Sequence, residues 1–298
     1  MASSNKRPHL ALETPDTTES SEESSGHDSD MEEGGEEDLV QAPNNEIQVE
    51  FQARTPEHCD INHGLYRLLK QLFRPHSNVD VGAVAELIVN QRNLGSVITQ
   101  GANDEESDEE EDDDDDEGSQ VFGVATIVPL GTGKPLANSI KEYLCDAVNK
   151  TDPKSTAVIQ TLKSADNSVG LIVSERIVNI PPQISVPLYE TLYHEVKKNK
   201  AKNVPGFNFS HYVMLSRMIV PTAEDSPGSI KPPPSWVNAE EEVIEEKADI
   251  LANVTLATDA PSISHDTSEF TETAKMVVFS AAKFEPILQS IRDAFPIH

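Results

Sequence analysis

"VGLIVSERIVNIPPQISVPLYETLYHEVKK" (residues 169–198) changes from a strand-like to a helix-like pattern within one short segment. Its first part, residues 169–179, is rich in β-branched residues and is the most strand-like segment of the chain. A proline pair follows, which suits a helix start. Apolar residues then recur at every fourth position, at Ile184, Leu188, Leu192 and Val196. A strand that leads through a short turn into a helix indicates an α/β domain.

Strand-like and helix-like segments alternate on both sides of this stretch. Period-two alternation predicts a strand at 46–53, where Ile47, Val49 and Phe51 share one side. Further strands are predicted at residues 96–100, 121–130, 211–220 and 276–281, and helices at 61–73, 78–91, 136–148, 158–162 and 284–295. Residues 241–258 fit neither period cleanly. Interleaved elements of this kind predict an α/β domain in which helices cover a sheet.

The charge of the chain is distributed unevenly. The 298 residues carry a formal net charge of −29, of which residues 1–45 carry −10 and the segment from Asp104 to Glu117 carries −13. Residues 1–45 contain no aromatic residue and few large aliphatic ones, which predicts a disordered acidic tail. We expect residues 46–298 to form a single α/β domain that contains an acidic loop at 101–119 and a proline-rich linker at 221–235.

The cysteine content and the lack of long apolar segments indicate the compartment in which the protein works. Cys59 and Cys145 form neither a disulfide framework nor a metal-ligand spacing, and the N-terminus lacks the apolar stretch of a signal peptide. No segment approaches the ~18 to 20 apolar residues that a membrane-spanning helix needs. We therefore expect a soluble protein of a reducing compartment.

Motifs that could carry chemistry are weak in this sequence. "LGTGKP" (130–135) follows a strand, but Val128 and Pro135 stand where a P-loop needs a glycine and a hydroxyl residue. Pro181 and Pro182 remove backbone N–H groups from the turn that follows the strand at 169–179, so this turn is a poor anion cradle. The spacing of His58, Cys59 and His63 is a weak match to a metal site. We predict no catalytic, cofactor or metal site.

Two segments of the sequence contain clusters of charged residues. Ser174 and Arg176 are expected on one face of their strand and Glu175 on the other, as a polar cluster at the end of a sheet. Downstream, a glutamate-rich segment contains Glu240, Glu241, Glu242, Glu245 and Glu246. Paired carboxylates can act in acid–base chemistry or bind a hard cation, but a solvated acidic face is the favoured interpretation.

The acidic loop has the charge density of a nucleic acid. Thirteen of the fourteen residues from Asp104 to Glu117 are acidic, interrupted only by Ser107. An extended chain advances about 3.3 to 3.6 Å per residue, close to the 3.4 Å charge spacing of one nucleic-acid strand. Such a polyanion repels DNA and RNA and attracts basic proteins, although a merely solubilising spacer is the competing interpretation. Predicted partner contacts there are Glu109, Glu110, Glu111, Asp112, Asp113, Asp114, Asp115, Asp116 and Glu117.

Two further sequence features bear on regulation. Ser107 and Ser29 have an acidic residue three positions on, the pattern that acidophilic kinases use, and each phosphate would add about −1.5 to −2 charges. "KKNKAK" (197–202) fits either a nuclear-import signal or a solvated helix end.

These segments together resemble the BCCIP family. The resemblance rests on "NEIQVEFQA", "HGLYRLLKQLF", "LGSVITQ" before the acidic stretch, "VFGVATIVPL" after it, "SERIVNIPPQ", "NAEEE" and "MVVFSAAKFEPILQSI", in that order. Its most specific parts are "NAEEE", with Glu240, Glu241 and Glu242 as further predicted partner contacts, and "SERIVNIPPQ", which contains Ser174, Glu175, Arg176, Asn179, Pro181, Pro182 and Gln183. The proline-rich segment "SIKPPPSW" departs from relatives that are lysine-rich there.

The resemblance implies an acetyltransferase-like (GNAT-like) α/β fold, with a mixed sheet flanked by helices and without an acetyl-CoA site. It also implies no enzymatic activity and no cofactor. It implies a nuclear chaperone or adaptor, able to shuttle to the cytoplasm, that shields a basic ribosomal protein of the large subunit and supports ribosome biogenesis and nuclear export. In animals the resemblance also implies association with a recombination mediator and a cyclin-dependent kinase inhibitor. The alternatives are therefore a cell-cycle or DNA-repair scaffold and, more remotely, an acyl-CoA-dependent acyltransferase; direct contact with nucleic acid or membrane is not expected.

Overall fold

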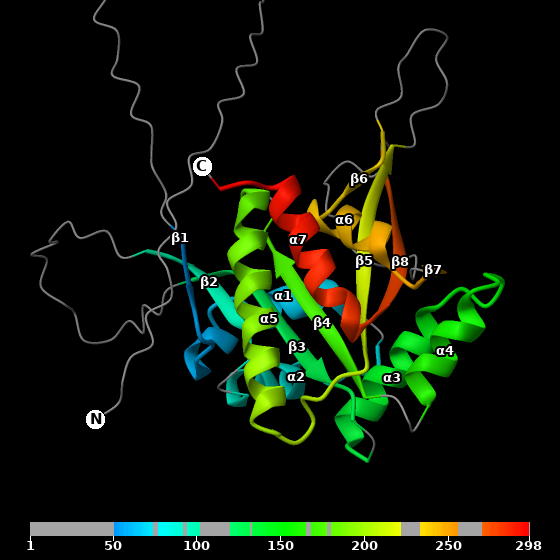
Figure 1. The fold of residues 1–298 in the computed structure, drawn as a ribbon, viewed down its shortest axis with the longest axis horizontal. Coiled ribbons are helices and arrows are strands. Elements are labelled where there is room, and N and C mark those ends of the chain that lie inside the picture. The colour runs from blue at the N-terminus through cyan, green and yellow to red at the C-terminus, as the bar shows by residue number, and fades with distance from the viewer. Residues whose placement is uncertain are drawn as a thin grey trace, which may run out of the picture.

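A single mixed β-sheet organises the structure (Figure 1). The computed structural model describes residues 51–73, 77–91, 94–101, 120–131, 133–164, 168–177, 180–221, 233–255 and 270–297. The sheet has eight strands in the order β1-β2-β3-β4-β5-β8-β7, with β6 paired to β5 off this path. The strands are β1 (Phe51–Arg54), β2 (Ser96–Gln100), β3 (Val121–Pro129), β4 (Val169–Arg176), β5 (His211–Pro221), β6 (Ser235–Trp236), β7 (Ile250–Val254) and β8 (Phe270–Ser280).

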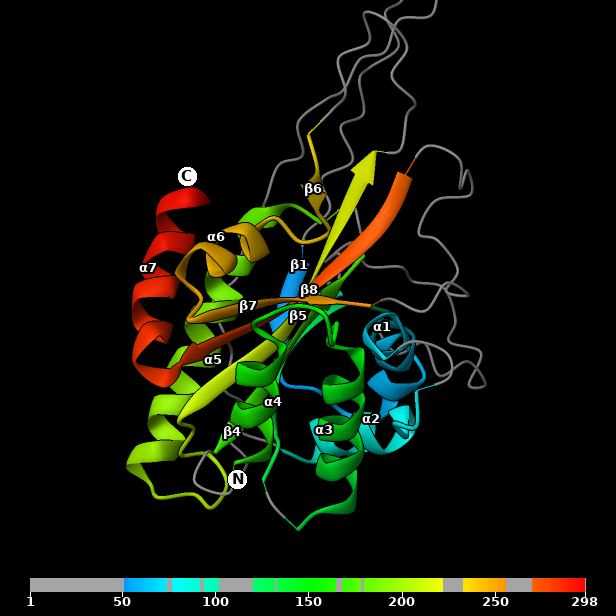
Figure 2. The same ribbon diagram turned by 90° about the vertical axis from the view of Figure 1, so that its right-hand side faces the viewer.

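Helices cover both faces of this sheet (Figures 1 and 2). One face packs against α1 (Leu65–Leu72), α2 (Val81–Asn90), α3 (Pro135–Ala147) and α4 (Ser155–Lys163). The other packs against α5 (Ser185–Ala201), α6 (Glu240–Lys247) and α7 (Phe284–Ala294). Short 3-10 turns stand at His58–Ile61, Pro182–Ile184 and Ala281–Lys283. No helix in the described ranges is long and apolar enough to cross a membrane.

Strand β4 shows why its sequence is apolar on both sides. All eight of its residues are buried, because helices cover both faces of the central sheet. Leu171 and Val173 enter the core on the α1–α4 side, whereas Ile172 enters the core on the α5–α7 side. The two cores are therefore separated by the sheet itself, and the predicted mixed sheet flanked by helices is confirmed.

The largest differences from the sequence prediction lie in the last third of the chain. The ambiguous segment 241–258 contains most of helix α6 and all of strand β7, separated by Ala248 and Asp249, and its residues 256–258 lie outside the described part. Strand β8 begins at Phe270 rather than at residue 276, because it pairs with β5 along its whole length up to Pro221. The predicted linker loses Pro221 to β5 and Ser235 to β6, while residues 222–232 lie outside the described part, as do Ile47 and Val49.

Strands β4 and β5 diverge, and this divergence positions the candidate site. They are the parallel pair of the sheet, and their register covers only Val169↔His211 to Leu171↔Val213. Beyond it, β4 continues against β3 as far as Arg176, while β5 continues against β8. Backbone groups of β4 and β5 past this point need other partners, because buried N–H and C=O groups are rarely left unpaired.

Candidate functional site

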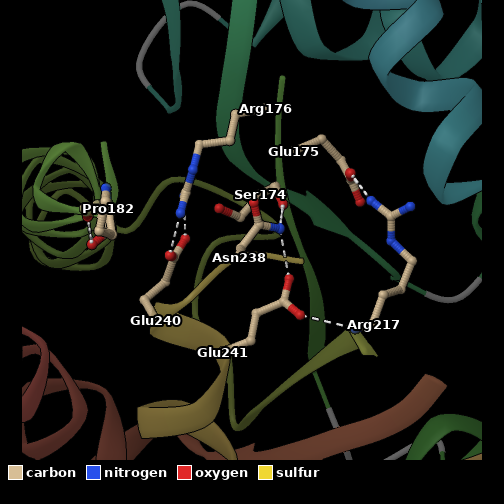
Figure 3. A network of polar contacts seen from close by, with 9 residues as sticks. Ser174, Glu175, Arg176, Pro182, Arg217, Asn238, Glu240 and Glu241 are labelled. Carbon is tan, nitrogen blue, oxygen red and sulfur yellow. Dashed lines mark hydrogen bonds and ion pairs between the residues drawn. The ribbon is translucent and has the colours of Figure 1, made fainter. Parts of the chain in front are cut away.

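Side chains from the "NAEEE" segment fill the gap between the diverging strands (Figure 3). The Asn238 amide nitrogen donates to the carbonyl oxygen of Ser174 on β4, at 3.4 Å, and to Glu241 Oε1, at 2.7 Å. Glu241 Oε2 accepts the backbone N–H of Arg217 on β5, at 2.9 Å. Asn238 and Glu241 thus form a polar bridge from one strand to the other, in place of the missing backbone pairing.

A buried ion pair ties α6 to the end of β4. The guanidinium of Arg176 donates from Nη1 to Glu240 Oε1 at 2.6 Å and from Nη2 to Glu240 Oε2 at 2.7 Å. The exposed fractions of the two side chains are 7% and 0%. A planar guanidinium matches both carboxylate oxygens at once, so this pair fixes orientation as well as neutralising charge.

A second ion pair lies on the opposite face of the sheet. Arg217 donates to Glu175 Oε2 and also lies 3.8 Å from Glu272 Oε1 on β8. Glu175 and Arg217 are both nearly inaccessible to solvent. Because neighbouring residues of a strand face opposite sides, Arg176 and Glu175 supply one pair to each face, as their alternation predicts.

Glu245 attaches the last turn of α6 to three elements. Its Oε1 accepts from the Ser216 hydroxyl at 2.5 Å and from the Trp236 indole N–H at 3.0 Å. Its Oε2 accepts from the Lys275 ammonium at 2.7 Å. One carboxylate therefore contacts β5, β6 and β8 together.

Burial changes the proton affinity of this cluster. Burial raises the pKa of Glu241 to about 8, although the Asn238 amide opposes the change. Burial likewise raises the pKa of Glu175, against the opposing effect of Arg217. Burial disfavours the charged form of Arg176, but Glu240 more than offsets it, so that the pKa of the guanidinium is raised. We infer that Glu241 is largely neutral near pH 7.

A comparison of the sequence with protein families identifies the chain. A sequence model of the BCCIP family matches residues 46–253, which is well over half of the chain. This chain belongs to the BCCIP family. The matched range includes the diverging strands, the filled gap and the acidic run.

Several BCCIP relatives match over most of their length. The "Protein BCCIP homolog" of Drosophila melanogaster is 30% identical over 260 residues, covering 84% of this chain and 85% of the relative. The mouse "BRCA2 and CDKN1A-interacting protein" is 28% identical over 264 residues, covering 83% of this chain and 81% of the relative. "Protein bcp1" of Schizosaccharomyces pombe is 31% identical over 57% of each chain. None of these three names states a catalytic activity.

A solved structure supports the BCCIP fold independently of sequence. The crystal structure of BCP1 from Saccharomyces cerevisiae aligns with a TM-score of 0.51 at 19% identity, covering 87% of this chain and 93% of that chain. At this identity the likeness concerns the fold alone. It agrees with the mixed sheet described above.

The glutamates between residues 240 and 246, three of them in the BCCIP motif "NAEEE", do not all lie on the solvated face that their sequence suggested. Glu240, Glu241 and Glu245 are 0%, 1% and 9% exposed, whereas Glu242 and Glu246 are exposed. The prediction of a solvated acidic face is wrong for the three buried residues, because the diverging strands present donors that these carboxylates satisfy. As partner contacts, Glu240 and Glu241 are already engaged inside the fold, and Glu242 alone stands open to solvent.

The second motif, "SERIVNIPPQ", places its charged residues in the same cluster. Ser174, Glu175 and Arg176 end β4, while Pro181 and Pro182 lead into α5 and Gln183 is half-buried. The Ser185 hydroxyl donates to the carbonyl of Pro182 at 2.6 Å. The proline pair thus shapes the start of α5, and Asn179 lies outside the described residues.

The other predicted sites either lie outside the described residues or are not part of a cluster that could bind a metal or carry out catalysis. Ser29, Ser107 and the acids Glu109 to Glu117 are not described, but the run joins β2 to β3, whose nearest described residues are Gly101 and Gln120. Within the described ranges no group of three metal-ligating side chains occurs. A surface cavity of about 340 Å³ is lined by Asn62, His63, Gly64, Arg67 and Gln120. It brings together no paired acid and base.

Sequence reasoning missed the partners of the motif residues. Arg217, Ser216 and Lys275 complete the cluster, yet they come from β5 and β8, far along the chain. One signal was available: Arg217 is the only ionised residue in the apolar strand segment 212–220. A charged residue in a buried strand needs a counter-charge, so Arg217 points to a buried acid elsewhere.

Proposed function

We propose that this chain is a non-enzymatic nuclear chaperone or adaptor that binds and shields a basic ribosomal protein of the large subunit. In this role it supports ribosome biogenesis and nuclear export, and it shuttles between nucleus and cytoplasm. Membership of the BCCIP family is the starting point, and the acidic run between β2 and β3 is the observation that carries the proposal.

The acidic run, rather than the buried carboxylates, supplies the negative charge with which a partner would interact. Buried carboxylates of the cluster, at Glu175, Glu240 and Glu245, already accept from arginine, lysine, serine or tryptophan donors. By contrast, thirteen acids are concentrated between Asp104 and Glu117. A client built to bind RNA carries the complementary positive charge, and attraction between them extends over about 8 Å at physiological salt.

A salt-dependent capture experiment tests this proposal. The full chain and a variant with all thirteen acids of 104–117 changed to amides are used to capture proteins from nuclear extract. We expect large-subunit ribosomal proteins on the unchanged chain, with capture falling steeply between about 50 and 200 mM salt, because the attraction is screened. Equal capture by the neutralised variant at every salt concentration would contradict the proposal.

A cell-cycle or DNA-repair scaffold is the second candidate function. The observation that favours it is the name shared by the bovine, mouse and human relatives, "BRCA2 and CDKN1A-interacting protein". Such a scaffold would hold its partners through packed surfaces rather than through the acidic run. Salt-resistant capture of repair factors by both the unchanged and the neutralised chain would favour it.

A further inference from the structure

The "KKNKAK" segment places four lysines at the end of α5. Lys197, Lys198 and Lys200 belong to the last turns of the helix, and Lys202 is the residue at which it ends. All four side chains are exposed. These four residues are called the lysine cluster below. Four positive charges within six residues contrast with the formal net charge of −29 of the whole chain.

The lysine cluster has no acidic counterpart in the described part of the protein. Among the described residues, no carboxylate forms an ion pair with any of the four ammonium groups. Glu195, the nearest acid along α5, accepts the backbone N–H of Gly95 at 2.8 Å. Lys197 Nζ lies 5.6 Å from the ring centre of Tyr193, a contact that leaves its charge in place. The positive charge of the cluster is therefore not neutralised by the described fold.

The ending of a helix does not account for four lysines. Backbone N–H groups already satisfy the last carbonyl groups of α5: Lys202 donates to the Lys198 oxygen at 3.1 Å, and Val204 donates to the Asn199 oxygen at 3.0 Å. One cation near a helix C-terminus contributes about 0.3 to 1 kcal/mol, but like charges four positions apart, such as Lys198 and Lys202, repel each other. The stability of the helix end therefore does not explain the cluster.

The fold presents the lysine cluster as a helical surface rather than as an extended segment. Val196 and Asn199, on the inward side of the same turns, are 8% and 4% exposed. A receptor that binds a lysine-rich segment in extended form would have to remove both side chains from the interior. In the folded form, the cluster from Lys197 to Lys202 covers about 7.5 Å of the helix axis.

The surroundings of the lysine cluster favour an acidic peptide over a nucleic acid. Proteins that bind single-stranded nucleic acid combine positive charge with aromatic side chains on which bases stack. The nearest aromatic residues, Tyr193 and Phe207, are half-buried, and their rings pack edge to face against Phe284 and Phe209. An extended peptide advances about 3.3 to 3.6 Å per residue, so about three or four consecutive acids match the length of the cluster.

The lysine cluster lies at the opposite end of the sheet from Gln120, the first described residue after the acidic run (Figure 1). Gln120 precedes β3, which begins beside the end of β4, where Gly123 pairs with Arg176. The turn after α5 leads instead to the beginning of β4, where Ser210 N–H donates to the Ser168 oxygen at 2.8 Å. Helix α5 spans 17 residues between these two ends, about 25 Å, which exceeds the ~8 Å over which charges interact at physiological salt.

We propose that the lysine cluster binds a short acidic peptide segment of a second partner protein without unfolding the end of α5. The inference goes beyond the proposed function, because it gives the protein a surface for a partner whose charge is opposite to that of the basic client. Complementary charge and the match in length supply the recognition, and the helix holds the four ammonium groups together before binding.

Titration with an acidic peptide tests the charge recognition. The probe is a blocked peptide of four glutamates, and NMR chemical shifts of the full chain at about 20 mM salt show where it binds. We expect the shifts to concentrate at residues 194–207 and the affinity to fall as salt is added. Changing the four lysines to glutamine should weaken binding at least about tenfold, whereas changing them to arginine, which keeps the charge, should preserve it.

Four exposed lysines elsewhere on the surface provide the matched control. They are Lys70, Lys134, Lys154 and Lys163. Changing these four to glutamine alters the net charge by the same amount as changing the cluster, so the affinity for the peptide should change by less than about twofold. An equal loss in both variants would show that only the net charge matters, and it would overturn the inference.

Two further measurements separate the proposed mode of binding from other modes. Amides of residues 196–204 should keep their protection from hydrogen exchange when the peptide is bound; loss of this protection would mean that the segment binds in extended form and would overturn the inference. Tighter binding of a uridine oligonucleotide with the same number of charges would assign the cluster to nucleic acid, with the same consequence. The proposed function is tested separately, because the variant neutralised at 104–117 retains all four lysines.

Discussion

Glu241 is the residue whose ionisation limits the stability of the cluster. Its pKa is raised to about 8 in the fold, from 4.5 in a solvated chain. A carboxyl group with a raised pKa is bound more favourably in its protonated form, so its contribution to stability is complete below pH 4.5 and is lost as the pH rises to about 8. A pKa difference of one between the folded and unfolded chain corresponds to about 1.4 kcal/mol of stability.

Replacing Glu241 by glutamine should remove this pH dependence. We expect the free energy of unfolding of the unchanged chain to fall by a few kcal/mol, about 2 to 4, between pH 5 and 8 relative to Glu241→Gln, in which position 241 no longer titrates. Asn238 Oδ1 accepts no hydrogen bond from the described residues, so a rotated Asn238 amide can accept from the new amide. Urea unfolding across this pH range measures the difference.

The neighbouring Glu242 provides the matched control for this titration. Glu242 is exposed, whereas Glu241 is 1% exposed. Glu242→Gln should therefore leave the pH profile of the unchanged chain as it is. Parallel profiles for the unchanged chain and Glu241→Gln would show that the carboxyl group is ionised in the fold, contrary to our expectation.

Substitutions of Arg176 and Glu240 test whether their buried ion pair stabilises the fold or mainly orients α6 against β4. Glu240→Gln leaves the guanidinium buried without a counter-charge and should lower the free energy of unfolding by about 3 to 5 kcal/mol. The double variant Arg176→Met/Glu240→Met removes both charges and should lose much less. Chemical denaturation of the single variants Arg176→Met and Glu240→Met and of the double variant gives the coupling energy, and additive losses would mean that the pair does not act as a unit.

At the scale of elements, α6 is held to the sheet mainly through polar contacts. Ile244 is its one fully buried apolar side chain, and the remaining inward positions are Glu240, Glu241 and Glu245. Apolar periodicity therefore could not assign this helix, because the pattern that marks a helix face counts apolar residues. Helices with an apolar face were found by this pattern: α1, with Leu65, Leu68, Leu69 and Leu72 buried, lies within the predicted range 61–73, although it begins four residues later.

The candidate site was less predictable than the fold for a related physical reason. Residues 96–100 coincide with β2 and residues 121–130 differ from β3 by one residue, because local apolar pattern encodes a strand. The burial of Glu240 depends instead on the divergence of β4 from β5, which results from pairings between distant segments. No local pattern of charge in the sequence indicates that two strands separate and leave hydrogen-bond donors for buried carboxylates.

Trp236 reports directly on the attachment of α6. It is the one tryptophan of the chain, and its indole N–H donates to Glu245. Glu245→Ala removes the acceptor shared by Ser216, Trp236 and Lys275, so we expect the tryptophan emission to shift to longer wavelength as β6 and α6 loosen. The cost in unfolding free energy should be about 1 to 3 kcal/mol.

The exposed Glu246 offers a control for the Trp236 experiment. Glu246→Ala changes the same helix by the same truncation, but its side chain faces solvent. Its emission spectrum should match that of the unchanged chain. A shift of equal size in both variants would point to loss of helix propensity rather than to the shared carboxylate.

At the scale of the whole molecule, the net charge of −29 opposes compactness. Like charges repel more strongly in the folded chain than in the expanded one, and salt screens this repulsion. We expect the thermal midpoint to rise as salt increases from about 10 to 300 mM, where the Debye length becomes short. The rise should be smaller in the variant with thirteen amides at 104–117, whose formal charge is nearer zero. The buried ion pairs of Arg176 and Arg217 are shielded from solvent, so they contribute little to the change of the thermal midpoint with salt. A midpoint that falls as salt is added would therefore mean that ion pairs on the surface, rather than repulsion, dominate the electrostatics of the fold.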